Sequence, residues 1–156
     1  MTAVTLVRHI KARPSTVFEL LSTADGLTSW WGPDDFPLLL SDTDVRVGGR
    51  FRVRFRTTDG LSHECAGEFL EIEPCERIAM SWEWTSGGEA QERGNVSRLE
   101  FNLQPTETGT ELTLVHSGMR DASQSGHTYG WGKALDKLVA LFDVAQQQSS
   151  GDPVRH

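Results

Sequence analysis

Apolar and polar residues alternate along most of the first 118 positions, the pattern of strands with one buried face. In the clearest run, 50–56, three apolar side chains alternate with four arginines. A second run, 78–84, puts Ile, Met and two Trp on one face. Alternate residues of a strand point to opposite sides of a sheet, so each run predicts a strand with one dry face and, at 50–56, a solvated arginine row. The same reasoning predicts strands at 4–12, 36–47, 63–72, 99–103 and 112–116.

Two short helices are expected between the first and second of these strands. Pro14 suits a first helical position, and Val17, Phe18 and Leu21 supply the apolar side of a helix that ends near residue 22. A second helix is predicted from about residue 25 to 30. The Gly-Pro pair at 32–33 must end it, because neither residue continues a helix readily.

The spacing of the apolar residues along the chain changes near residue 125. Apolar residues and one histidine then recur every three or four positions, which predicts a helix of about six turns. These positions are His127, Trp131, Leu135, Leu138, Val139 and Phe142. The pattern predicts an α+β helix-grip fold, in which a curved seven-stranded antiparallel sheet and two short helices accompany one long C-terminal helix. We expect a single domain over residues 1–145 and a disordered polar tail over 146–156.

Composition narrows the range of partners. The chain has 156 residues, a formal charge of −7 and no apolar run near the about 20 residues of a membrane span, so neither nucleic acid nor membrane insertion is expected. No signal-like segment precedes the first strand, which predicts a cytoplasmic protein.

Cys65 and Cys75 are expected to be free thiols. His63 and Cys65 share a strand face, but zinc needs more ligands, so we predict no metal and no cofactor.

The inner-face side chains allow two interpretations. They can fill a core, which is the usual role of such residues, or line a cavity that one helix leaves open on a curved sheet. The candidate ligand-binding residues are Trp30, Trp31, Phe36, Phe51, Val53, Phe55, Phe69, Met80, Trp82, Trp84, Phe101, Leu114, His127 and Trp131.

Three residues are candidates for proton chemistry. His127 and His116 are predicted to face inward, although an inward histidine more often makes a structural hydrogen bond. Arg8 lies on the inner face of the first strand, where we expect it to pair with an acidic side chain or to bind a ligand oxyanion, and we prefer the pair. Near His127, glycines 126, 130 and 132 allow either a close approach to the sheet or a mobile gate opposite Trp30, Trp31 and Phe36.

Several short motifs resemble one family. They are 8-RHIKA-12 with Pro14, 17-VF-18, 30-WWGP-33, 48-GGRF-51, 70-LEIEP-74, 82-WEW-84, and His127 with Gly130-Trp131 and Leu135. With them, residues 4–142 resemble the SRPBCC (START-like, helix-grip) superfamily, in the branch similar to the C-terminal domain of the ATPase activator of the ninety-kilodalton heat-shock chaperone. The resemblance implies a cavity between helix and sheet.

The resemblance leaves the activity open, since one scaffold carries many functions. Our leading interpretation is binding of a small hydrophobic, aromatic or polyketide-like molecule by a monomer or homodimer. The alternatives are an enzyme similar to polyketide cyclases, aromatases or dehydratases, and a module that contacts a chaperone. The chain lacks the N-terminal chaperone-binding domain of the eukaryotic activators, which argues against the last.

Overall fold

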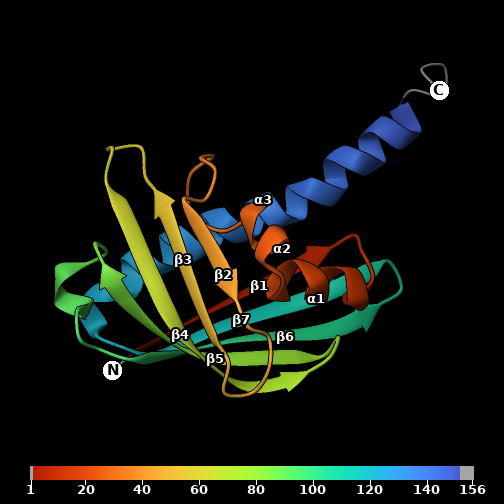
Figure 1. Cartoon of the computed structure of the whole chain (residues 1–156). Coiled ribbons are helices and arrows are strands. Elements are labelled where there is room, and N and C mark those ends of the chain that lie inside the picture. The colour runs from red at the N-terminus through yellow and green to blue at the C-terminus, as the bar shows by residue number, and fades with distance from the viewer. Residues whose placement is uncertain (1, 152–156) are drawn as a thin grey trace.

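The fold is a curved sheet that closes around one long helix (Figure 1). The computed structural model describes the backbone of residues 2–151 and the side chains of residues 2–143. Within that part, the strands are β1 (Thr2–Ile10), β2 (Leu40–Thr43), β3 (Arg50–Arg56), β4 (Ser62–Glu73), β5 (Arg77–Ser86), β6 (Ser97–Thr106) and β7 (Gly109–Met119). The helices are α1 (Pro14–Ser22), α2 (Ala24–Thr28) and α3 (Gln124–Gly151), with 3-10 turns η1 (Ala90–Glu92) and η2 (Asp121–Ser123).

The sheet is antiparallel throughout, in the order β1-β7-β6-β5-β4-β3-β2. Consecutive strands from β2 to β7 are neighbours, as hairpins require, and β1 pairs with β7 through the register Leu6↔Leu114. The α+β helix-grip prediction is therefore confirmed.

Strand β2 is shorter than the predicted 36–47. Pro37 has no N–H for a ladder, and the side chains of Val45 and Val47 are exposed. Residues 44–49 form the turn into β3, where Gly48 has a φ of +87°. The alternation of apolar and polar residues in this segment therefore does not correspond to a buried face of the sheet. This part of the prediction was wrong.

Strand β4 bends the sheet. Its pairing with β5 slips at Glu64/Cys65 and again at Phe69/Glu71, and such bulges increase local twist. Between the two slips, a Cβ at Gly67 would lie 1.8 Å from the Ser81 carbonyl oxygen, so only glycine allows this approach. The predicted solvated arginine row of β3 is confirmed, because all four arginines are exposed.

Helix α3 lies across the inner face of the sheet (Figure 1). Leu135 and Leu138 are fully buried in the core with residues of β3 to β7. No helix within residues 2–151 has the length and apolarity that a bilayer crossing requires. The predicted tail, 146–156, falls partly within α3, and its last five residues lie outside the described ones.

Candidate functional site

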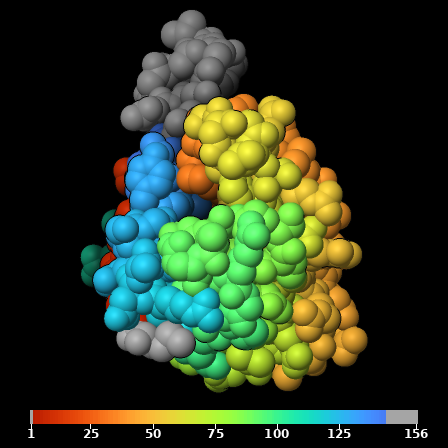
Figure 2. All heavy atoms as spheres, turned by 90° about the vertical axis from the view of Figure 1, so that its left-hand side faces the viewer, coloured from red at the N-terminus to blue at the C-terminus, as the bar shows by residue number. Residues whose placement is uncertain are grey.

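A cavity of about 420 Å³ opens beside the first half of α3. The loop after α2, the β3–β4 hairpin and the end of β5 with its following loop form the other walls, and Figure 2 shows a hollow where these segments meet the helix. The lining residues are Trp31, Gly32, Pro33, Asp34, Phe55, Thr57, Thr58, Asp59, His63, Trp82, Trp84, Gly88, Glu89, Gly126, His127, Tyr129, Gly130, Trp131 and Ala134.

The structure divides the candidate ligand-binding residues into two groups. Those that line the cavity are Trp31, Phe55, Trp82, Trp84, His127 and Trp131. Those that do not line it are Trp30, Phe36, Phe51, Val53, Phe69, Met80, Phe101 and Leu114. Seven of the second group belong to the buried core, where α1, α2 and the second half of α3 fill the wedge, so the open space is confined to one end of the sheet. Phe36 instead lines an adjoining hollow with Lys133 and Lys137.

Aromatic rings form most of the cavity wall. Trp31 meets Trp131 edge to face at 5.0 Å between ring centroids, and Trp82 meets Trp84 at 4.7 Å. Edge-to-face packing is favoured by ring quadrupoles and holds the indoles in fixed orientations. The rings therefore present a preformed apolar surface.

His116, buried next to the cavity, is locked in one neutral form. The Trp131 indole Nε1 donates to its Nδ1 at 2.9 Å, so Nδ1 is an acceptor. Nε2 must then carry the proton and donate to Ser97 Oγ at 2.7 Å, while that hydroxyl donates to the Trp82 carbonyl. Burial lowers the pKa of His116 from 6.5 to about 3. Both ring nitrogens of His116 are engaged in hydrogen bonds, which favours a structural role over the acid/base chemistry considered from the sequence.

His127 lies one turn into α3 and is only 4% exposed. Its Nδ1 is 3.0 Å from both the Ser123 carbonyl oxygen and Glu89 Oε1. A carbonyl oxygen only accepts, so Nδ1 carries the proton. Nε2 is buried and has no hydrogen-bond partner.

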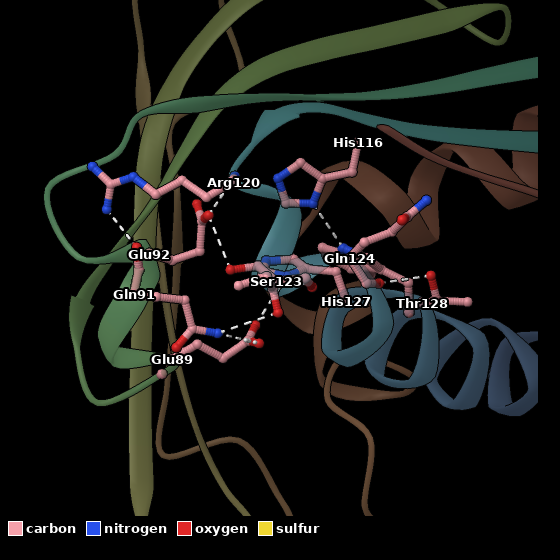
Figure 3. A network of polar contacts seen from close by, with 12 residues as sticks. Glu89, Gln91, Glu92, His116, Arg120, Ser123, Gln124, His127 and Thr128 are labelled. Carbon is pink, nitrogen blue, oxygen red and sulfur yellow. Dashed lines mark hydrogen bonds and ion pairs between the residues drawn. The ribbon is translucent and has the colours of Figure 1, made fainter. Parts of the chain in front are cut away.

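A buried carboxylate holds the start of α3 in place, as Figure 3 shows. Glu92, on η1, accepts from the Arg120 backbone N–H at 2.6 Å and from Ser123 Oγ at 3.0 Å with Oε1, and from Asn95 Nδ2 at 2.8 Å with Oε2. Burial alone would raise the pKa of Glu92, but these donors outweigh it and the pKa is lowered. Because Ser123 also accepts from His127, Glu92 helps to position that imidazole.

The Glu89 carboxylate lies close to α3 at Gly126. A Cβ there would lie 2.6 Å from Glu89 Oε2. Partial burial raises the pKa of Glu89, the nearby His127 opposes that effect, and Glu92 adds to it. The neighbour of Gly126 is thus a loop side chain and not the sheet, and a Cβ at Gly130 would meet nothing within 4 Å, so the expected close approach of the helix to the sheet is seen at neither glycine.

Arg8 lies away from the cavity. Its Nε donates to Asp136 Oδ1 on α3 at 3.0 Å and its Nη1 to the Val7 carbonyl. The preferred expectation of an acidic partner is confirmed, and this pairing leaves Arg8 outside any chemistry in the cavity.

The His63 and Cys65 side chains have separate surroundings. His63 lines the cavity, accepts at Nδ1 from the Gly88 N–H at 2.8 Å, and contacts Thr57 Oγ1 through Nε2 at 3.0 Å. Cys65 is fully buried, which raises its thiol pKa. No three His, Cys, Asp or Glu side chains in the described part of the chain are grouped as a metal site would need.

Sequence reasoning missed the acidic residues of the site, Glu89 and Glu92. Both lie in a polar loop with no periodic pattern, so nothing local separates them from solvated glutamates. One signal was available, the three-residue spacing from Glu89 to Glu92 and on to Asn95, which places them on one side of a tight turn.

Fold and cavity together define the class of protein, a helix-grip domain of the SRPBCC type with a cavity between its sheet and its last helix. The family described as Activator of Hsp90 ATPase homolog 1-like protein matches residues 11–143, and the chain belongs to this family. A search of the curated proteins finds no match.

Solved structures of bacterial proteins share the fold. Protein CV1439 from Chromobacterium violaceum is 26% identical with a TM-score of 0.77, over 91% of this chain and 98% of that one. Protein MLL2253 from Mesorhizobium loti is 26% identical with a TM-score of 0.71, over 91% and 97%. The AHSA1 (SPO3351) protein from Silicibacter pomeroyi is 23% identical with a TM-score of 0.77, over 92% and 99%. At 23% identity, the similarity to the Silicibacter pomeroyi protein shows a shared fold and nothing about function.

Proposed function

We propose that the protein binds a small, largely apolar molecule in the cavity beside the first half of α3. The observation that carries this proposal is the cavity of about 420 Å³, walled by Trp31, Phe55, Trp84 and Trp131. Small-molecule sites are commonly concave, apolar and preformed, with volumes of about 300–1,000 Å³. A ligand with fused or linked rings fits both the volume and the stacking faces.

The position of the cavity supports binding over a purely structural gap. It opens to the surface beside a helix segment with three glycines, which lower helix stability by about 1 kcal/mol each relative to alanine. Seven of the other candidate residues are buried in the hydrophobic core. Space has therefore been left at one end of an otherwise filled core.

The family description refers to activation of a chaperone ATPase, and contact with a chaperone is an alternative function. An enzyme similar to polyketide cyclases, aromatases or dehydratases is a second alternative, with His127 as the remaining proton-handling candidate. We favour binding because four tryptophans, His127 and two of the helix glycines all line the cavity.

The test uses a neutral fluorescent probe of apolar sites, N-phenyl-1-naphthylamine. Fluorescence titration should show saturable binding to the wild-type protein. Trp84→Ala removes one wall of the cavity, so we expect about tenfold weaker binding, in line with the loss of one aromatic contact.

Phe36→Ala is the matched control, because it deletes an aromatic side chain outside the cavity. Its affinity for the probe should remain within about twofold of wild type. Absence of saturable binding to the wild type, or equal losses in the two variants, would defeat the proposal.

A further inference from the structure

Three lining residues of the cavity carry buried nitrogens without a hydrogen-bond partner. They are Nε1 of Trp82, which has only the Cys65 thiol nearby, Nε1 of Trp84 and Nε2 of His127. Buried polar atoms are nearly always paired, so each of these is unusual. Their location on one cavity indicates that a bound molecule supplies the missing partner.

His127 has the most restricted requirement of the three. Its Nδ1 proton is held by the Ser123 carbonyl and Glu89 Oε1, so in the neutral ring Nε2 offers a lone pair. That lone pair can only accept. A partner for it must therefore donate a hydrogen.

The side chains around His127 leave that partner to the ligand. The His116 ring is 4.8 Å away between centroids, and both of its nitrogens are engaged. The Trp82 ring is 5.3 Å away and has no hydrogen bond to His127. The charged groups facing the imidazole are the carboxyls of Glu89, which directly precedes η1, and of Glu92, the last residue of η1.

Those carboxyls also select against an anion. A ligand carboxylate or sulfonate at Nε2 would oppose the lone pair and enter the field of two acidic side chains. A neutral hydroxyl group can donate its hydrogen to Nε2, and it carries no negative charge for the two carboxyls to repel. It can also accept from an indole N–H, and Trp84 has such a donor free, with its ring 6.3 Å from that of His127.

We propose that the ligand of this cavity is an aromatic or conjugated molecule with a phenol- or enol-type hydroxyl, which donates its hydrogen bond to His127 Nε2. This inference rests on the proposed function and specifies its ligand class. Glu89 acts as a positioning residue, since it holds the Nδ1 proton in place and makes Nε2 a better acceptor.

The experiment compares two probes of nearly equal shape, 2-naphthol and 2-methylnaphthalene, by displacement of N-phenyl-1-naphthylamine. We expect the wild type to bind 2-naphthol about tenfold more tightly, the effect of one buried hydrogen bond. In His127→Leu the two probes should bind equally, while 2-methylnaphthalene binds as it does to the wild type.

His9→Leu is the matched control, because His9 is a histidine of β1 that lies outside the cavity. It should retain the wild-type preference for 2-naphthol. Glu89→Gln should reduce that preference without abolishing it.

A measurement on the wild type removes any dependence on how the variants fold. The ¹⁵N resonance of His127 Nε2 should move upfield on addition of 2-naphthol and stay unchanged with 2-methylnaphthalene. An unmoved resonance, equal wild-type affinity for the two probes, or a preference that survives in His127→Leu would overturn the hydroxyl assignment. Binding of 2-methylnaphthalene would leave the proposed function standing, whereas failure of both probes to bind would defeat that function itself.

Discussion

At the scale of single residues, His116 and His127 show how partners decide the role of a side chain. Their rings are 4.8 Å apart and both are buried. His116 has a donor on one side and an acceptor on the other, so its proton is fixed and its ring is structural. His127 has acceptors on one nitrogen and no partner on the other, which leaves Nε2 open to a ligand.

The fixed neutral state of His116 should appear in the pH dependence of stability. Its pKa is lowered in the folded protein to about 3, so only the unfolded chain binds this proton between pH 6.5 and 3. The stabilisation by a neutral His116 is complete above pH 6.5 and is lost as the pH falls toward 3. In His116→Gln, whose amide can also accept from Trp131 and donate to Ser97, we expect a shallower slope. The difference should be about 1.4 kcal/mol per pH unit at most.

Urea unfolding at several pH values between 7 and 4 measures both slopes. The comparison with the variant is necessary, because carboxyls with lowered pKa values, such as those of Glu64 and Glu92, also reduce stability as the pH falls. Identical slopes would contradict the assignment.

At the scale of elements, the first turn of α3 is held by a side chain from another segment. Glu92, from η1, accepts from the Arg120 N–H and from the Ser123 hydroxyl, which directly precede the helix. Loop and helix are thereby joined through one buried carboxylate. The position of His127 depends on that junction.

We expect Glu92→Gln to lower the free energy of unfolding by about 2 kcal/mol. The glutamine amide would bring its own N–H groups to a site where all three neighbours donate, and hydrogen bonds to a charged group contribute about 1.5–3 kcal/mol. Chemical denaturation provides the measurement. Glu107→Gln, in an exposed turn, is the control and should change stability by less than about 0.5 kcal/mol.

At the scale of the whole molecule, α3 has a fixed half and a half that lines the cavity. Leu135 and Leu138 anchor the second half in the core, and Lys137 donates to the Asp34 carbonyl at 2.8 Å. The ion pair of Arg8 with Asp136 ties the same half to β1. The first half, around His127 and Trp131, packs against the cavity instead.

Hydrogen exchange should reveal this division. In the free protein we expect amides of residues 124–133 to exchange faster than those of 134–142, because the glycines weaken the first half and the core protects the second. Saturation with N-phenyl-1-naphthylamine should slow exchange in 124–133 and leave β6 and β7 unchanged. Uniformly strong protection along the helix of the free protein would rule out a mobile gate.

The sequence by itself determined the elements and their order. The apolar face of each predicted strand must be buried against another element. The apolar residues that recur every three to four positions after residue 124 predict one helix long enough to bury it. The helix-grip fold could therefore be predicted from local patterns. The same patterns predicted Arg8 with an acidic partner and the solvated arginines of β3. They failed at β2, where alternation in 36–47 had no neighbouring face to support it.

Only the tertiary structure decided where the cavity lies and which polar groups serve it. The fourteen candidates came from strands, a loop and the last helix, and no local pattern separates the six that line open space from those that α1, α2 and the end of α3 enclose in the core. Glu89 and Glu92 lie in a loop without hydrophobic periodicity, and their roles arise from contacts with residues 28 to 38 positions away. The protonation of the two histidines likewise depends on donors and acceptors that only folding brings within 3 Å.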